Sequence, residues 1–207
     1  MGNARIIVKV GGSLFDLPDL RHRLRAFLSQ LGEAKILFVP GGGATADAIR
    51  AFDAVHQVGE EAAHWLAIRA LSLNAGLLHG LLPEARIVAE IPGTVAKHMP
   101  RASALASGAT GVCQRWYILD PFPFFREDER RDDHLPHDWH VTSDSLAVRV
   151  ATLANAADLL LLKSTAWSGS NWTDAAEAGI VDSYFARALR QAPASLRIRL
   201  VNFRAND

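Results

Sequence analysis

Short apolar segments that end in glycine alternate with helical patterns along this chain, and this alternation is the feature that most limits its fold. Arg5 to Val10 is a β-branched run that stops at Gly11-Gly12, and Ile36 to Val39 is an apolar run followed closely by three glycines. Apolar residues at helical spacing fill the interval between them, and Gly32 ends that pattern. Short apolar strands separated by helices are typical of a parallel sheet covered on both faces. The pattern predicts an α/β fold.

The rest of the chain continues this alternation. We expect further helices at about residues 44–55, 60–82, 143–155 and 183–190, and further strands at about 86–90, 112–119, 158–162 and 197–203. Residues 120–139 are rich in proline, charge and aromatic side chains and are expected to form a long loop, which in a compact chain is usually functional or mobile. No repeat or linker divides the sequence. We therefore expect one domain over residues 1–207, a three-layer αβα sandwich with a mainly parallel central sheet.

Composition excludes several classes of protein. Lys and Arg together number 22 and so do Asp and Glu, so the chain lacks the basic excess of a nucleic-acid-binding protein. A neutral surface does little to oppose self-association, and we expect a homo-oligomer. No apolar run approaches the roughly 20 residues of a membrane span, and no signal-peptide pattern opens the chain. The single cysteine, Cys113, cannot form an internal disulfide. We expect a cytoplasmic protein that binds neither nucleic acid nor membrane.

The first candidate site is the run Val8-Lys9-Val10-Gly11-Gly12-Ser13. The strand delivers Lys9 near its carboxyl end, where ligands collect in open α/β sheets. Lysine gives a compact positive charge, and glycine amides ahead of a helix can bind an anion. A tight turn beside a solvated lysine explains these residues equally well when they are taken alone. The order of a Walker A motif is absent.

The second candidate site is Gly41-Gly42-Gly43, between an apolar strand and a helix. Three consecutive glycines are costly in backbone entropy, and a structural turn usually needs only one. The run indicates that something must come very close to the backbone here. Two such turns in neighbouring strand–helix units could hold the two ends of one transfer reaction.

Two further segments place polar residues at the ends of regular elements. Thr142 or Ser143 can cap the helix that follows, and Asp144 in its first turn suits the helix dipole. A cap does not explain four successive polar residues, and Asp144 could instead hold a lysine or help to manage a metal ion. Lys163 follows a fully apolar strand, where it either faces a ligand or extends to solvent.

Three histidines in the 120–139 region and just after it are spaced three apart: His134, His137 and His140. Such spacing suggests a metal site when a helix aligns the side chains. Pro136 argues against a helix here, and no cysteine joins the group. We therefore expect no metal site.

Taken together, the four segments resemble the amino-acid kinase superfamily, which includes acetylglutamate, carbamate, uridylate and isopentenyl phosphate kinases. The resemblance spans nearly the whole chain and depends on the order and spacing of the motifs. Three segments are similar to the aminomethylfuran phosphate kinase branch, which is linked to methanofuran-type one-carbon cofactor synthesis: His64 to Ile68, Trp139 to Ser145 and Gly179 to Phe185. The resemblance implies a kinase that converts a phosphate monoester to a diphosphate.

The resemblance also implies roles for individual residues, with ATP and Mg²⁺ as cofactors. Lys9 would neutralise the phosphoryl group during transfer, Asp144 would orient Lys9, and Lys163 would add a second charge that faces phosphate. The residues implied to contact ATP are Lys9, Gly11, Gly12, Ser13, Lys163, Ser164, Thr165 and Gly169. Those implied to contact the acceptor, a small phosphate or carboxylate, are Gly41, Gly42, Gly43, Thr142 and Ser143.

The chain departs from the family pattern after its late apolar strand. Many members carry Val-Asp-Gly there, whereas this chain has the run Lys163 to Gly169 without an acid. Members also often have a lysine near the Gly179 segment, where this chain has Asp182. These departures favour an alternative, a non-catalytic nucleotide- or oxyanion-binding protein of the same fold, whereas Lys9, Asp144 and Lys163 favour the kinase.

Overall fold

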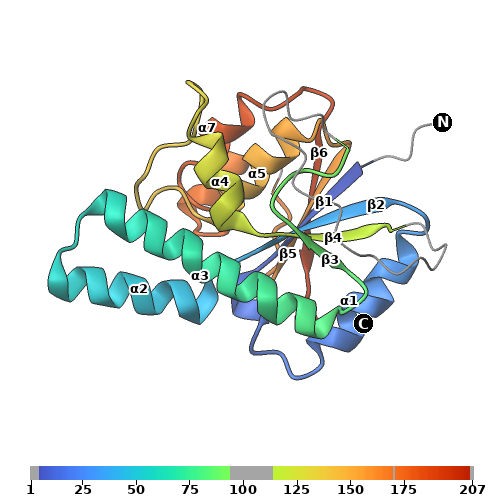
Figure 1. The fold of residues 1–207 in the computed structure, drawn as a ribbon. Coiled ribbons are helices and arrows are strands. Elements are labelled where there is room, and N and C mark those ends of the chain that lie inside the picture. Colours follow the sequence, from blue (N-terminus) through green and yellow to red (C-terminus); the bar gives the residue numbers. More distant parts are fainter. Residues whose placement is uncertain (1–4, 94–113, 170, 206–207) are drawn as a thin grey trace.

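The computed structural model describes residues 5–93, 114–169 and 171–205. Within them, six parallel strands form one sheet in the order β3-β4-β2-β1-β5-β6 (Figure 1). The strands are β1 (Arg5–Val10), β2 (Lys35–Pro40), β3 (Arg86–Val88), β4 (Trp116–Leu119), β5 (Asp158–Lys163) and β6 (Arg197–Asn202). The predicted parallel sheet is confirmed.

Helices cover the sheet on both faces, as Figure 1 shows. One apolar core lies between the sheet and α4 to α7, and the second lies between the sheet, α1 and the second half of α3. The helices are α1 (Leu20–Gln30), α2 (Gly43–His56), α3 (Glu60–Leu81), α4 (Pro121–Asp128), α5 (Ser143–Leu153), α6 (Trp172–Glu177) and α7 (Phe185–Leu189). The predicted three-layer αβα arrangement is confirmed.

The central strand β1 is buried on both faces, and its alternation assigns each residue to one core. Ile7 packs in the core under α5, whereas Val8 and its neighbours two residues away pack in the core under α1. Side chains alternate along a strand, so Lys9 shares the face of Ile7 and points toward α5. Its register partners are Val39 in β2 and Leu161 in β5. The alternation of apolar residues along β1 thus determines which face of the sheet Lys9, the only charged residue in the buried part of this strand, occupies.

The structure corrects the sequence prediction in three places. The expected loop at 120–139 begins with a helix, α4, whose first residue is Pro121. Proline is well tolerated there because the first amides of a helix lack partners anyway. The sequence also missed α6, whose start is capped by the Asn171 side chain accepting from the Thr173 amide. The strand expected from residue 112 runs from Trp116 to Leu119, and residues 112–113 lie outside the described part.

Helices α2 and α3 form a pair that extends away from the sheet (Figure 1). None of the residues of α2 is buried, and its apolar side chains Phe52 and Val55 are 62% and 73% exposed. Leu73 and Leu77 of α3 are also exposed. No helix in the described ranges combines the length and apolarity needed to cross a bilayer.

Candidate active site at the strand ends

Three neighbouring strands deliver the predicted site residues to one edge of the sheet. Lys9 is the penultimate residue of β1, the three glycines follow β2, and Lys163 is the last residue of β5. Strands β2, β1 and β5 are adjacent and parallel, so their carboxyl ends meet at the same rim. Ligands in open α/β sheets bind at that rim.

A single buried carboxylate holds the two lysines together. Asp144, in the first turn of α5, lies with Oδ1 2.8 Å from the Nζ of Lys9 and accepts a 2.6 Å hydrogen bond on Oδ2 from the Nζ of Lys163. Lys9 and Asp144 are 3% and 4% exposed. Two ammonium groups against one carboxylate leave these three largely buried side chains with a net positive charge. Such a site favours an anionic ligand.

The ionisation of this triad follows from burial and charge. Burial alone would raise the pKa of Asp144, but the ammonium groups of Lys9 and Lys163 outweigh it and hold that pKa below its ordinary value. Burial and the charge of Lys9 lower the pKa of Lys163 to about 8, although Asp144 partly offsets them. Lys163 is therefore a cation at neutral pH that sits close to its titration point.

The two glycine turns lie in direct contact. A Cβ atom on Gly12 would lie 2.0 Å from the amide nitrogen of Gly43, and one on Gly41 would lie 2.4 Å from the amide nitrogen of Gly12. Gly43 also has a φ of +53°, which side chains disfavour. The sequence indicates that something lies very close to the backbone of the three consecutive glycines. Part of that close neighbour is the Gly11-Gly12 turn. Because glycine has no side chain, the two turns can pack directly against each other at the same edge of the sheet.

The turns present backbone amides to the rim. Within the described residues, four of these amides donate to no protein acceptor: those of Gly12, Ser13, Gly42 and Gly43. The Gly11 amide instead donates to the Leu162 carbonyl, and the Gly41 amide donates to the Val10 carbonyl, both at 2.8 Å. The expectation that Gly11 donates to phosphate is therefore corrected, because its N–H already completes the sheet. Amides without a protein acceptor at the carboxyl ends of strands are available to bind an anion.

The start of α5 is capped by a residue from elsewhere in the chain. Asp182 accepts hydrogen bonds from the amide and hydroxyl of Thr142 and from the amide and hydroxyl of Ser145. The structure shows no cap bond from the Thr142 side chain itself, which corrects the predicted local cap. Burial, with Asp144 nearby, raises the pKa of Asp182 above its usual range even though Ser145 and Thr142 oppose the rise. In the sequence, Asp182 stands out only because many family members have a lysine there, and this capping role was not predicted.

A cavity of about 240 Å³ opens above the triad. Its lining includes the predicted residues Lys9, Gly11, Gly12, Ser13, Gly42, Gly43, Thr142, Ser143, Asp144 and Lys163. This volume is below the roughly 300–1,000 Å³ of common ligand pockets, so it suits a small acceptor and terminal phosphates more than a whole nucleotide.

Other predicted residues lie outside the cavity lining. The Ser13 hydroxyl donates to the Ser164 hydroxyl at 3.0 Å and ties the first turn to the end of β5. Thr165 and Gly169 follow in the same segment, where Gly169 packs against the Trp167 ring. Gly41 belongs to the second turn, and its carbonyl accepts a hydrogen bond from the Asn74 side chain.

The cavity lining also includes residues that had no predicted role, among them Arg50, His64 and Trp139. The Arg50 guanidinium lies 4.6 Å from the centre of the Trp139 ring, and the Trp139 ring N–H donates to Asp53. Burial, with His137 nearby, lowers the pKa of His64 to about 4, so this ring is neutral at physiological pH. The signal for Arg50 was present, since it follows Gly43 by seven residues and so shares a helix face with it.

Comparisons with known proteins agree on one family of relatives. The model of the amino acid kinase family matches residues 4–166. The [5-(aminomethyl)furan-3-yl]methyl phosphate kinase of Methanocaldococcus jannaschii is 24% identical over 158 residues, which is 75% of this chain. The match spans 63% of that relative's length, so the chain covers less than two thirds of it.

Solved structures share the fold. The UMP kinase of Bacillus anthracis superposes with a TM-score of 0.60 at 15% identity, over 97% of this chain and 87% of that one. The uridylate kinase of Archaeoglobus fulgidus gives a TM-score of 0.55 at 16% identity, over 95% and 89%. These superpositions establish a common fold. Sequence identities this low do not establish a common substrate.

Proposed function

The chain belongs to the amino acid kinase family, and from this premise we propose that its cavity transfers the γ-phosphoryl group of ATP to a small anionic acceptor. Family membership and the relative named as a phosphate kinase support kinase activity. The observation that carries the proposal is the Asp144 carboxylate, which holds the ammonium groups of Lys9 and Lys163 beside free turn amides.

The residues present suit the phosphates of ATP. The amides of Gly12 and Ser13 open a helical turn at the end of β1, and Lys9 and Lys163 line the same cavity. Amides and ammonium groups together are the usual partners of phosphate oxygens. The Gly42 and Gly43 amides, at the start of α2, would face the acceptor's own phosphate or carboxylate. The direct contact between the two turns supports this division, because it brings donor and acceptor together.

Phosphoryl transfer to an anionic acceptor requires the protein mainly to position the two reactants and to neutralise their charge. An acceptor oxygen forms a bond to the γ-phosphorus while the bond from that phosphorus to the β,γ-bridging oxygen breaks, and the charge moves to ADP. An acceptor that is already an anion carries no proton at the attacking oxygen, so no general base is required. Lys9 and Lys163 would offset the repulsion between two anions, and Asp144 would keep both ammonium groups in place. Preorganised charges of this kind often supply the largest catalytic effect.

Mg²⁺ is implied by the family, and the described cavity residues suit it less well than they suit ATP. The lining carboxylates already have partners, since Asp144 holds the lysines, Asp47 pairs with Arg50, and Asp138 accepts from two amides of its own loop. Such a site offers the ion no free carboxylate cage. Mg²⁺ would have to be held largely by the nucleotide phosphates and water, and no step above depends on it.

For the acceptor we propose a phosphate monoester, with an aminomethylfuran phosphate as the first compound to test. The support is the resemblance of His64 to Ile68 and of Gly179 to Phe185, together with the relative from M. jannaschii. Both His64 and Asp182 of these segments contribute to the cavity or to its support. The small cavity volume also favours a compact acceptor.

We retain a homo-oligomer as part of the proposal. Exposed apolar side chains of α2 and α3, Phe52, Val55, Leu73 and Leu77, support it, because apolar residues gathered on one helix pair often mark a contact surface. Light scattering on the purified chain would measure the mass, and a monomer at micromolar concentration would contradict this part.

The test is acceptor-dependent release of ADP. Purified protein is incubated with Mg²⁺-ATP and a panel of phosphate monoesters, carboxylates and a blank, and ADP is measured by a coupled assay. We expect ADP only with phosphate monoesters, in an amount equal to the diphosphate formed. If ATP binds with a measurable affinity but no acceptor is consumed, the non-catalytic binding protein is the correct assignment.

A further inference from the structure

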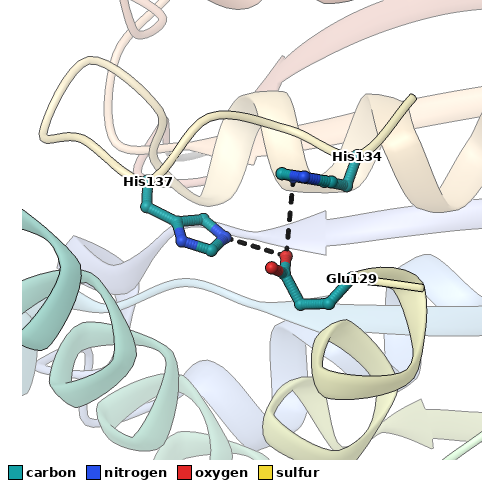
Figure 2. A group of neighbouring side chains, drawn as sticks. All are labelled: Glu129, His134 and His137. Atoms are coloured by element: carbon teal, nitrogen blue, oxygen red, sulfur yellow. Dashed lines mark hydrogen bonds and ion pairs between the residues drawn. The ribbon is translucent and has the colours of Figure 1, made fainter. Parts of the chain in front are cut away.

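A second group of polar side chains lies beyond the cavity wall, at the end of α4 and in the loop after it. Glu129 follows α4, and His134 and His137 come from the loop. Figure 2 shows both imidazole rings beside the Glu129 carboxylate. One nitrogen or oxygen from each of the three residues lies within 4.8 Å of the others. The sequence predicted no metal site here, because Pro136 argues against a helix that would align the histidines, but the tertiary fold brings two of the rings together beside Glu129.

The separations are close to those of a metal coordination shell. Glu129 Oε1 lies 2.8 Å from His137 Nε2 and 3.7 Å from His134 Nδ1. In a tetrahedral zinc site with bonds of about 2.0–2.1 Å, ligand atoms lie about 3.3 Å apart. The two measured distances lie on either side of that value. Small side-chain movements would therefore suffice to admit an ion.

His137 also has an acceptor for its other ring nitrogen. His137 Nδ1 lies 2.5 Å from the Glu61 carboxylate. In His134 the nitrogen that faces Glu129, Nδ1, also lies 2.9 Å from the Leu135 carbonyl, which leaves Nε2 for an ion. Histidine ligands almost always donate their second N–H to a carboxylate or a carbonyl, which fixes the tautomer that binds the metal. His134 is the most exposed of the three, so its ring can turn to bring Nε2 into the group.

The loop that carries these ligands is anchored on both sides. Arg149 of α5, whose side chain is 2% exposed, makes paired hydrogen bonds to Asp128, just before Glu129, and to Asp133, just before His134. His137 stacks on His64 with ring centres 4.4 Å apart. Supporting contacts of this kind hold ligands near the geometry that an ion needs.

We propose that Glu129, His134 and His137 bind a divalent transition metal ion, and that Zn²⁺ is the ion that fits this donor set. Two imidazoles and one carboxylate are a common zinc ligand set, with water in the fourth position. The site is separate from any Mg²⁺ that accompanies ATP. His64 stacks on one ligand and also lines the cavity, and the loop continues into Asp138 and Trp139. The bound ion would brace this wall of the cavity.

The test uses metal alone, with the untagged chain stripped by a chelator. Titration with Co²⁺, followed in the visible range, should give one equivalent with the intense absorption of a four-coordinate ion, and Zn²⁺ should displace it. The exposed His134→Ala and the isosteric Glu129→Gln should both lose this absorption. Glu61→Gln removes the negative charge that supports His137, while Glu61 also accepts from the Trp65 ring N–H, and should weaken affinity about 10–100-fold.

His140→Ala is the matched control, because His140 lies in the same loop but its Nδ1 faces the Ser183 hydroxyl instead. It should bind Co²⁺ as the wild type does. Zn²⁺ should also raise the Tm of the wild type and leave that of His134→Ala unchanged, while the metal-free proteins melt alike.

Two results would overturn the proposal. One is a wild-type chain that shows only the weak spectrum of hydrated Co²⁺. The other is an equal loss of binding in His140→Ala and His134→Ala. The three residues would then be an ion-pair network in which a protonated His137 donates to Glu61 and Glu129.

Discussion

The floor of the cavity and its outer wall are built in different ways. The floor, formed by Lys9, Asp144 and Lys163, comes from the ends of buried strands and the first turn of a buried helix. The outer wall, formed by His64 and the segment 138–142, comes from a helix that extends past the sheet and from a loop held by ion pairs. The backbone fixes the floor, whereas side-chain contacts fix the wall. Chemistry should therefore depend on the floor, and acceptor affinity on the wall.

The largest effect should come from removal of the central floor charge. Lys9→Ala should lower kcat/KM about 10³-fold, because it removes a preorganised ammonium group where charge is transferred. Lys35→Ala is the control, since Lys35 is exposed at the opposite end of the neighbouring strand. Steady-state kinetics measure both. Equal rates in the two variants would place the reaction away from this floor.

The next effect should come from separating the two glycine turns. Gly12→Ala places a Cβ 2.0 Å from the Gly43 nitrogen, so the turns must move apart. We expect kcat/KM to fall about 10²-fold and the Tm to drop. Gly80→Ala, in α3 with nothing within 4 Å of its added Cβ, should instead stabilise the protein by about 0.5–1 kcal/mol. A fully active Gly12→Ala would show that close contact between the turns is unnecessary.

The pH profile tests the charge of the floor. Lys163 has its pKa lowered to about 8, so it is charged below that pH and loses its proton above it. If the cation is needed, kcat/KM should fall about tenfold per pH unit above pH 8. In Lys163→Ala this alkaline decline should vanish from an already lower rate. An unchanged decline in the variant would assign it to another group.

The smallest effect should come from the wall. Trp139→Leu removes the hydrogen bond to Asp53 and the ring under Arg50. We expect the KM for the acceptor to rise about 3–10-fold while kcat stays within about twofold, because the floor is unchanged. A loss confined to kcat would instead mean that the wall takes part in the chemistry.

The floor could be predicted from the sequence because period-two alternation and glycine position determine it. The apolar run from Ile6 to Val10 indicates which face of the sheet Lys9 occupies, and the apolar residues of β5 indicate the same for Lys163. Asp144 follows from its place in the first turn of a helix. Local patterns carry this information because each residue's direction is set by its own strand or helix.

The wall could not be predicted, because its contacts join residues far apart in the chain. Asp182 caps α5 from about 40 positions away, and Glu61 reaches His137 across 76. Nor does any local pattern show that Arg149 would hold the segment from Asp128 to Asp133. The sequence also explained the three consecutive glycines only in part, since the backbone that lies closest to them belongs to the first glycine turn, at Gly12.

The central claim is that one phosphoryl group passes between the two glycine turns beside Lys9. A crystal structure with a non-hydrolysable ATP analogue and a phosphate monoester tests this most directly. We predict the γ-phosphate within hydrogen-bond distance of the Lys9 Nζ and the Gly12 amide, with the acceptor phosphate at the Gly42 and Gly43 amides. A γ-phosphate bound elsewhere, with Lys9 still paired only to Asp144, would contradict the account.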